Sequence, residues 1–436
     1  MRVETRNSYL DSLLQSRDAV AEAGSDWLRA LRMRAVERSN ELSVPTTRDE
    51  DWRFTDLSAL YKASFRLVAE PRALETAQIG TFAVPEAEIR LVFVDGHYST
   101  EHSQLPRSGG VTIGNLADLP DALEALAKKH LASLATIDHD AFAAVNTAFL
   151  RDGAVIHVES GHDMKSPIHL LFVATSRDSV AYPRVLVVVD AGAQCTVVED
   201  FIGEGEGGYL TDAVSEIFVA ENARMSHVRL QRESSGAFHI GNTSVQVARG
   251  GSYSAWTVAL GARISRHDLA LVQAGEGTEF SVDGLALIGG RQLADTHSSI
   301  DHAHAHGRSR QLHKTVVAGG AHAVFNGKIL VRKGAQQTDS GQQSRNLLLS
   351  DKARVDTKPQ LEIFADDVKC AHGAAVGQID ANELFYLKSR GLSDRVARNL
   401  LTYAFAAEVV ERIPVKSLAG RLEQAILEQT QTKEDA

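Results

Sequence analysis

The stretch RVLVVVDAGAQCTVVEDF, residues 184–201, joins two runs rich in β-branched residues through a tight turn built around Gly192. Glycine, asparagine and aspartate favour such turns because they tolerate a left-handed backbone. Similar turns between strand-like runs recur further on: AENARM (220–225), ARGGSY (248–253), QAGEGT (273–278), RKGAQQ (332–337) and SDKARV (350–355). The first of these turns follow one another at roughly 25–30 residues, a spacing typical of one solenoid coil each. The pattern predicts a mainly β fold, a parallel β-helix.

The composition of the same region agrees with long strands. No proline occurs between Pro183 and Pro359, and no helical period lasts three turns there. Proline is excluded from the interior of a sheet because it lacks a backbone N–H. The turn spacing becomes irregular after 278, so a β-sandwich built on the same strands remains an alternative from the pattern alone.

Helical periodicity flanks the strands on both sides. Apolar residues recur at helical spacing over 8–38 and again over about 120–150, and the intervening 86–118 mixes short strands with turns. Helices are also predicted over 381–431, where Gly391 ends one helix and Ser393 caps the next.

The length of 436 residues allows one large core with smaller appendages. We therefore expect an N-terminal helical and mixed region (1–150), a β-helix core (151–375) and a C-terminal helical region (376–436). The net charge of −10 argues against nucleic acid or an anionic membrane surface as the main partner, because both attract basic faces. The N-terminus has no signal-peptide pattern and no apolar run reaches the ~20 residues of a membrane helix, so a soluble, cytoplasmic protein is expected.

The chain has two cysteines, Cys195 and Cys370, and Cys370 lies in DDVKCAHGAAVG (366–377) close to His372. Thiolate and imidazole are ligands for iron, zinc or an iron–sulfur cluster, and residues two apart on a strand share a face. A typical cluster takes four ligands, so this pair is incomplete without a second protein. The alternative is a buried cysteine beside a histidine with a structural role.

Six histidines gather in the segment that precedes this pair: His297, His302, His304, His306, His313 and His322. On a strand, His302, His304 and His306 would share a face, but such residues are ~6.5–7 Å apart, too far to share one ion. A polar face is the favoured interpretation. A stand-alone histidine-ligated metalloenzyme remains the alternative function.

Glycine-rich segments do not form a nucleotide site. GEGEGG (203–208) does not open a helix, and its glutamates would repel a pyrophosphate. GAHAVFNGKI (320–329) has Ile329 where a P-loop needs serine or threonine. Any ATP that is used must therefore be hydrolysed by a partner. The acidic pair Asp366–Asp367 could serve acid–base chemistry, but exposed carboxylates at a strand end are common.

Three long segments resemble the SufB/SufD family of iron–sulfur cluster assembly proteins. FNGKILVRKGAQQTDSGQQSRNLLLSDKARVDTKPQLEIFADDVKCAHGAAVGQIDANELFYLKSRGL (325–392) resembles the family core, PTTRDEDWRFTDL (45–57) its N-terminal element, and DTHSSIDHAHAHGRSRQLHK (295–314) its histidine-containing segment. Together they cover most of 45–412. SufB-like members carry a cysteine at the position of Ile363 and a glutamate at that of Gly373, so this chain resembles the SufD branch.

The resemblance implies a right-handed parallel β-helix with helical flanks, acting as a non-catalytic scaffold. It implies a heterodimer with a SufB homologue, or a homodimer in isolation, and a transient iron–sulfur cluster at the shared interface with His372 as a ligand and Cys370 close by. It also implies that a SufC ATPase docks on the C-terminal helices, for which Phe385, Leu400 and Phe405 are the candidate contacts. Reduced flavin is associated with the assembled complex in the family, but no flavin motif is visible here.

Overall fold

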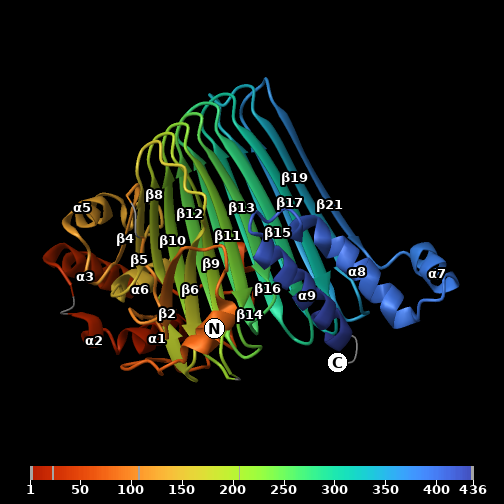
Figure 1. Cartoon of the computed structure of the whole chain (residues 1–436), viewed down its shortest axis with the longest axis horizontal. Helices are drawn as coiled ribbons and strands as arrows, with labels where there is room; N and C mark the ends of the chain where they lie inside the picture. The colour runs from red at the N-terminus through yellow and green to blue at the C-terminus, as the bar shows by residue number, and fades with distance from the viewer. Residues whose placement is uncertain (1–2, 22–23, 107–108, 206, 434–436) are drawn as a thin grey trace.

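The computed structural model describes residues 3–21, 24–106, 109–205 and 207–433. Figure 1 shows a stack of long strands with most of the N-terminal helices at one end, while the C-terminal helices lie over the later strands and extend past the last one. The strands run side by side from β5 (Ala154–Val158) to β21 (Lys369–Gly377). The predicted mainly β core with helical flanks is confirmed.

Successive strands alternate between two sheets, which makes a flattened solenoid with two strands per coil. Leu210 pairs with Phe238, Phe238 with Ile264, and Ile264 with Leu293, all in parallel register. One coil thus takes roughly 30 residues, as expected for a solenoid. The first sheet contains β8 (Arg184–Val189), β10 (Leu210–Val219), β12 (Phe238–Val247), β14 (Ile264–Gln273), β16 (Leu293–His302), β18 (His322–Val331) and β20 (Arg354–Ile363). The second contains β6 (Ile168–Ala174), β9 (Gln194–Gly203), β11 (Arg224–Arg232), β13 (Ser252–Ala259), β15 (Glu279–Ile288), β17 (Arg308–Val317), β19 (Asp339–Leu348) and β21.

The turns between strands adopt the backbone that their sequences predict. Gly192, Asn222, Gly250 and Gly277 have φ values of 69°, 57°, 65° and 69°. This left-handed region costs little for glycine and is tolerated by asparagine. These four turns reverse the chain once per coil, and the β-sandwich alternative is wrong. The turn predicted at 350–355 differs, because it lies between β19 and β20 on the other side of the coil and has no left-handed residue.

The filling of the solenoid lumen changes along its length. In the early coils, Phe93, Phe172 and Phe201 stack with ring centroids 5.1 and 4.8 Å apart, inside a large apolar cluster. In the last coils, polar residues occupy the inward positions of the second sheet, and Ser340 and Gln342 are buried there at 2% and 1% exposure. A buried polar lining costs free energy, which points to a purpose other than stability.

The N-terminal region forms helices and also extends the sheets. Its helices are α1 (Val3–Leu14), α2 (Asp18–Ala21), α3 (Asp26–Glu41), α4 (Thr76–Phe82), α5 (Asp121–His130) and α6 (Ala141–Ala148), with the 3-10 helix η1 (Glu50–Trp52). Its strands are β1 (Arg66–Leu67), β2 (Ile89–Val94), β3 (His97–Tyr98) and β4 (Val111–Asn115), and β7 (Ser179–Ala181) follows in the core. β2 pairs in parallel with β6, and β4 pairs antiparallel with β5. The first end of the solenoid is therefore covered by the chain itself.

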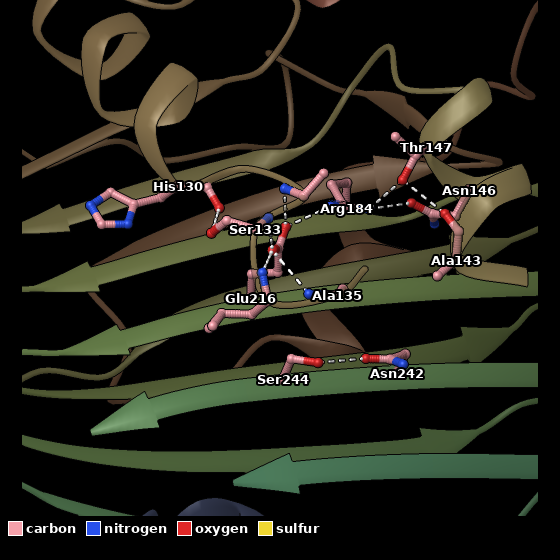
Figure 2. A network of polar contacts seen from close by, with 12 residues as sticks. His130, Ser133, Ala135, Ala143, Asn146, Thr147, Arg184, Glu216, Asn242 and Ser244 are labelled. Atoms are coloured by element: carbon pink, nitrogen blue, oxygen red, sulfur yellow. Dashed lines mark hydrogen bonds and ion pairs between the residues drawn. The ribbon is translucent and has the colours of Figure 1, made fainter. Parts of the chain in front are cut away.

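A buried polar network joins these helices to the first sheet (Figure 2). Glu216 on β10 accepts hydrogen bonds from the backbone N–H groups of 132–135, in the turn after α5. The same carboxylate pairs with Arg184, which also donates to Asn146 and Thr147 on α6. Glu216 thus holds both the turn after α5 and, through Arg184, α6 against the solenoid.

The C-terminal region forms α7 (Ala381–Ser389), α8 (Asp394–Val410) and α9 (Lys416–Lys433). Ser393 caps α8 by accepting a hydrogen bond from the Val396 N–H, and Gly391 has a φ of 92°, as the sequence predicted. Helices α8 and α9 pack on the second sheet, whereas α7 projects past β21 (Figure 1). Among the described residues, no helix is long and apolar enough to cross a membrane.

Candidate functional site at the terminal coil

The last coil of the solenoid, formed by β20 and β21, is open on its outer side. Within the described chain, β20 pairs only with β18, and β21 pairs only with β19. Each strand therefore presents a row of unpaired backbone groups along its free edge, a template for another strand. Pro359 lies in β20, where a missing N–H is tolerated because the strand is at an edge.

Cys370 and His372 lie on β21 with one residue between them, so the structure brings both predicted ligands to one face. In the register of the sheet, Cys370 pairs with Ser340, and His372 pairs with Gln342. Because Ser340 and Gln342 are buried in the lumen, the two candidate ligands face the lumen at its open end. Cys370 is half-buried against a small apolar cluster, and His372 is exposed.

The thiol of Cys370 is held in its protonated form. Burial raises its pKa above the ordinary value; a hydrogen bond with the Ser340 backbone lowers it, and the nearby Asp339 carboxylate raises it again. A metal that binds the sulfur must displace this proton. The thiol therefore stays protonated and unreactive until a metal cation binds its sulfur.

Apolar side chains are exposed on the same coil. Ile363 at the end of β20 is 40% exposed, Phe364 directly after it is 64% exposed, and Val376 on β21 is 48% exposed. A solenoid normally ends in a polar or covered coil, since bare apolar ends promote association. Sequence reasoning missed these three residues. For Ile363 and Phe364 the signal was a mostly apolar run, 361–364, that closely follows Pro359, the first proline after Pro183.

Two rows of polar side chains lead through the lumen to the candidate ligands. Ser309 and Ser340 precede Cys370 in one row. In this row, Ser309 Oγ lies 2.6 Å from Ser340 Oγ and 2.9 Å from His302 Nε2. Gln311 and Gln342 precede His372 in the neighbouring row. These residues were also missed, although alternate polar residues in SGQQSRN (340–346) are a visible signal.

The six histidines do not assemble into one site. His302 ends β16 and is buried, which lowers its pKa to about 4, and His313 is buried with a pKa of about 3. His304 and His306 lie in the following turn, so the shared strand face considered for these residues is not present. Among the described residues there is no group of three or more histidine, cysteine or acidic side chains that could hold a metal. The stand-alone metalloenzyme gains no support.

His297 and His322 lie apart from the lumen row. His297 contacts Asp295 at 3.1 Å on the outer face of the first sheet. His322 lies 2.7 Å from Asp356 on the adjacent strand. Both side chains have carboxylate partners, which is typical of a structural role.

The segment that resembles the family's N-terminal element crosses the outer face of the first sheet. Trp52 stacks on Arg266, whose guanidinium carbon lies 3.8 Å from the ring centroid. Glu50 pairs with Lys358 of β20 at 2.6 Å. The N-terminal region thereby contacts the terminal coil directly.

The predicted ATPase contacts lie in different surroundings. Phe385 on α7 is 73% exposed and Leu400 on α8 is 44% exposed. Phe405 is half-buried in the apolar cluster between α8 and the second sheet, where Lys314 lies 4.6 Å above its ring. Two of the three residues thus form an exposed surface, and the third packs against the solenoid.

Ion pairs tie α8 and the turn that follows it to strands β15 and β17 of the second sheet. Glu408 pairs with Lys314, and Arg412 pairs with Asp283 at 3.2 Å. A groove of about 650 Å³ lies at this end of the second sheet, and its lining includes Glu408 of α8 and both Gln342 and His372. The ion pairs therefore connect α8 to the sheet of which β21 is the last strand.

Comparison with known proteins identifies the family of the chain. Residues 172–405 match the SUF system FeS cluster assembly SufBD core domain, and residues 3–170 match the SufBD protein N-terminal region. An iron–sulfur cluster assembly SufBD family protein of Synechocystis sp. is 41% identical over 417 residues, which cover 91% of this chain and 89% of the relative. The iron–sulfur cluster assembly proteins SufD of Escherichia coli and Bacillus subtilis are 34% and 27% identical; the matches cover 85% of both chains for E. coli, and 92% of this chain and 93% of the relative for B. subtilis. The chain therefore belongs to the SufBD family of iron–sulfur cluster assembly proteins.

Proposed function

We propose that this chain is a non-catalytic scaffold that docks its terminal coil on a homologous SufB-type β-helix and contributes His372 and Cys370 to a cluster assembled between the two chains. The observation that supports this most is the open coil itself. Its two edges are unpaired in the described chain, its apolar side chains are exposed, and both candidate ligands lie on it.

The energetics favour a partner at this position. Strand addition would pair the free backbone groups of β20 and β21. Phe364, Ile363 and Val376 would lose exposed apolar surface, and full burial of such a side chain is worth about 1.5–3 kcal/mol. Since each is already partly covered, these values are upper limits. Docking of the partner would cover this surface, so the open end of the solenoid would not aggregate non-specifically in the assembled complex.

The ligand chemistry also requires a second chain. One thiol and one imidazole on a single strand supply half of a typical ligand set. The raised pKa of Cys370 keeps its sulfur protonated before assembly. A nascent cluster would therefore be bound only when the partner's ligands complete the site, which links cluster formation to docking.

A SufC-type ATPase is proposed to dock on the exposed apolar surface of α7 and α8. This surface consists of Phe385, Tyr386, Val396 and Leu400, at 73%, 56%, 45% and 44% exposure. None of the residues of α7 is buried, so the helix does not contribute to the core. Phe405 would support the surface from beneath. Through the Glu408 and Arg412 ion pairs, movement of α8 would reach the sheet that carries β21.

Co-purification tests the docking face directly. Val376→Asp and Phe364→Asp should abolish capture of a co-expressed SufB-type partner, because a carboxylate would be buried in the interface. Met33→Asp is the matched control, since Met33 is 65% exposed on α3 at the other end of the molecule. Wild-type capture by both terminal-coil variants, with unchanged circular dichroism, would refute the proposal. A complex that contains two copies of this chain and no partner would replace the heterodimer with a homodimer.

A further inference from the structure

Gln342 lies directly beneath His372 in the lumen. The two residues pair in register on the parallel strands β19 and β21, so their side chains leave the sheet on the same side. Paired residues on adjacent strands are ~4.8 Å apart, within reach of a glutamine side chain. His372 is exposed at the open end, whereas Gln342 is 1% exposed one strand deeper.

The carboxamide of Gln342 has no hydrogen-bond partner. In the part of the chain that the structure describes, neither its Nε2 nor its Oε1 is paired, although both atoms are buried. An amide can make up to four hydrogen bonds, and burying one without any is costly. The unpaired carboxamide of Gln342 is therefore available for a hydrogen bond with the ring of His372.

A glycine on the opposite sheet makes room for this side chain. A Cβ atom added to Gly327 on β18 would lie 2.0 Å from Gln342 Nε2 and 2.6 Å from its Cδ. Any larger residue at 327 would push the carboxamide aside. The absence of a side chain at 327 therefore lets Gln342 extend across the lumen in the coil next to the open end.

One coil deeper, Gln311 occupies the same row and has a partner. Its Oε1 accepts a hydrogen bond from Ser298 Oγ at 2.8 Å. Among the described residues the Nε2 of both glutamines is unpaired, so the two equivalent positions differ at Oε1, which has a serine partner in Gln311 and none in Gln342. The difference singles out Gln342.

We propose that Gln342 is a positioning residue for His372, an inference that rests on the proposed role of His372 as a cluster ligand. A ring nitrogen that binds metal must offer its lone pair, so the other ring nitrogen carries the proton. We infer that a change of side-chain rotamer lets that N–H donate to Oε1 of Gln342, which has no partner among the described residues. The bond selects one tautomer and turns the ring so that its free nitrogen points out of the lumen, as outer-shell partners do for metal-binding histidines.

The test reads the tautomer in the full chain without any metal. The chain is labelled with ¹⁵N-histidine, His372→Ala assigns the signal, and ring ¹⁵N shifts are measured at about pH 8, where imidazole is neutral. The wild type should show one tautomer. Gln342→Leu should give a mixture, and Gln342→Glu, which keeps an acceptor, should restore one tautomer. Gln343→Leu is the matched control, because Gln343 is exposed on the opposite face of β19.

A second readout uses the complex reconstituted with SufB- and SufC-type partners. Gln342→Leu should lower cluster yield severalfold, with Gln342→Glu and Gln343→Leu near the wild-type yield. A single unchanged tautomer in Gln342→Leu would overturn the positioning role. So would a wild-type yield for Gln342→Leu when His372→Ala is defective. If His372→Ala gives a normal cluster yield, the proposed role of His372 as a ligand is refuted. The ¹⁵N measurement of the tautomer still decides whether Gln342 positions the ring of His372.

Discussion

Arg184 and Glu216 form an ion pair at 2.5 Å in which both side chains are almost completely buried, at 1% and 0% exposure. Removing one partner of such a pair leaves an uncompensated buried charge, which costs about 3–5 kcal/mol. Glu216→Ala should lower the free energy of unfolding by at least this amount, since the substitution also removes the acceptor of the backbone N–H groups after α5. Urea unfolding followed by circular dichroism measures the change.

An exposed ion pair serves as the control for that measurement. Arg249 and Glu221 lie 3.0 Å apart on solvent-facing turns, with side chains 63% and 54% exposed. Such pairs are screened by solvent, so Arg249→Ala should leave the unfolding midpoint unchanged. Equal losses in both variants would show that Glu216 has no special role in holding the N-terminal helices.

A buried acid makes stability depend on pH. Burial raises the pKa of Asp212 well above its ordinary value, and nearby Asp140 raises it further while Arg184 opposes the shift. Below about pH 3.9 the side chain is protonated in both states. Above it, the unfolded chain releases the proton and the folded chain keeps it, so folding loses up to about 1.4 kcal/mol per pH unit until the folded-state pKa is reached.

Asp212→Asn removes this titration. The variant should be more stable than the wild type at pH 7, and its advantage should shrink as the pH falls toward 4. Unfolding midpoints in urea at a series of pH values measure the difference. Asp351→Asn, at an exposed turn, should follow the wild-type curve. An advantage for Asp212→Asn that does not vary with pH would contradict the assignment.

Glycines in the lumen make room for polar side chains. A Cβ at Gly284 would lie 2.4 Å from His313 Nδ1, whereas nothing lies within 4 Å of a Cβ at Gly377. Gly284→Ala should therefore lower the free energy of unfolding by about 1–3 kcal/mol through overpacking. Gly377→Ala should leave it close to the wild-type value. Thermal unfolding of both variants checks this, and a neutral Gly284→Ala would mean that His313 moves aside freely.

The exposed surface of α7 and α8 predicts the ATPase contact. Phe385→Asp should abolish pull-down of a SufC-type partner, because Phe385 is 73% exposed and its loss leaves the core intact. Leu400→Asp should do the same. Capture of the SufB-type partner should persist in both variants, since the terminal coil is separate from this surface. Retained SufC binding with normal folding would remove the docking role.

Sequence reasoning reached the fold because its signals are local. The turns at 189–194, 220–225, 248–253 and 273–278 each encode a left-handed residue, and the absence of proline from 184–358 allows uninterrupted strands. Ser393 and Gly391 likewise mark a helix start and end through their own backbone chemistry. Each of these features is decided by neighbours in the chain.

The side chains that face the lumen could not be predicted from local sequence in the same way. Whether Gln342 faces inward depends on register across several coils, and its relation to Gly327 joins residues on opposite sheets. Phe405 was expected to contact the ATPase, yet its ring packs against Lys314 from a strand that is distant in sequence. Burial of a helix face depends on what lies opposite it, which periodicity alone does not contain.

The central claim is that β21 supplies ligands to a site completed by a second chain. The direct measurement is the iron and sulfide content of the complex co-expressed with SufB- and SufC-type partners, compared between the wild type and His372→Ala. We expect His372→Ala to assemble the same complex with a several-fold lower content, and Cys370→Ala to show a smaller loss. An intact complex with a wild-type iron and sulfide content in His372→Ala would contradict the claim.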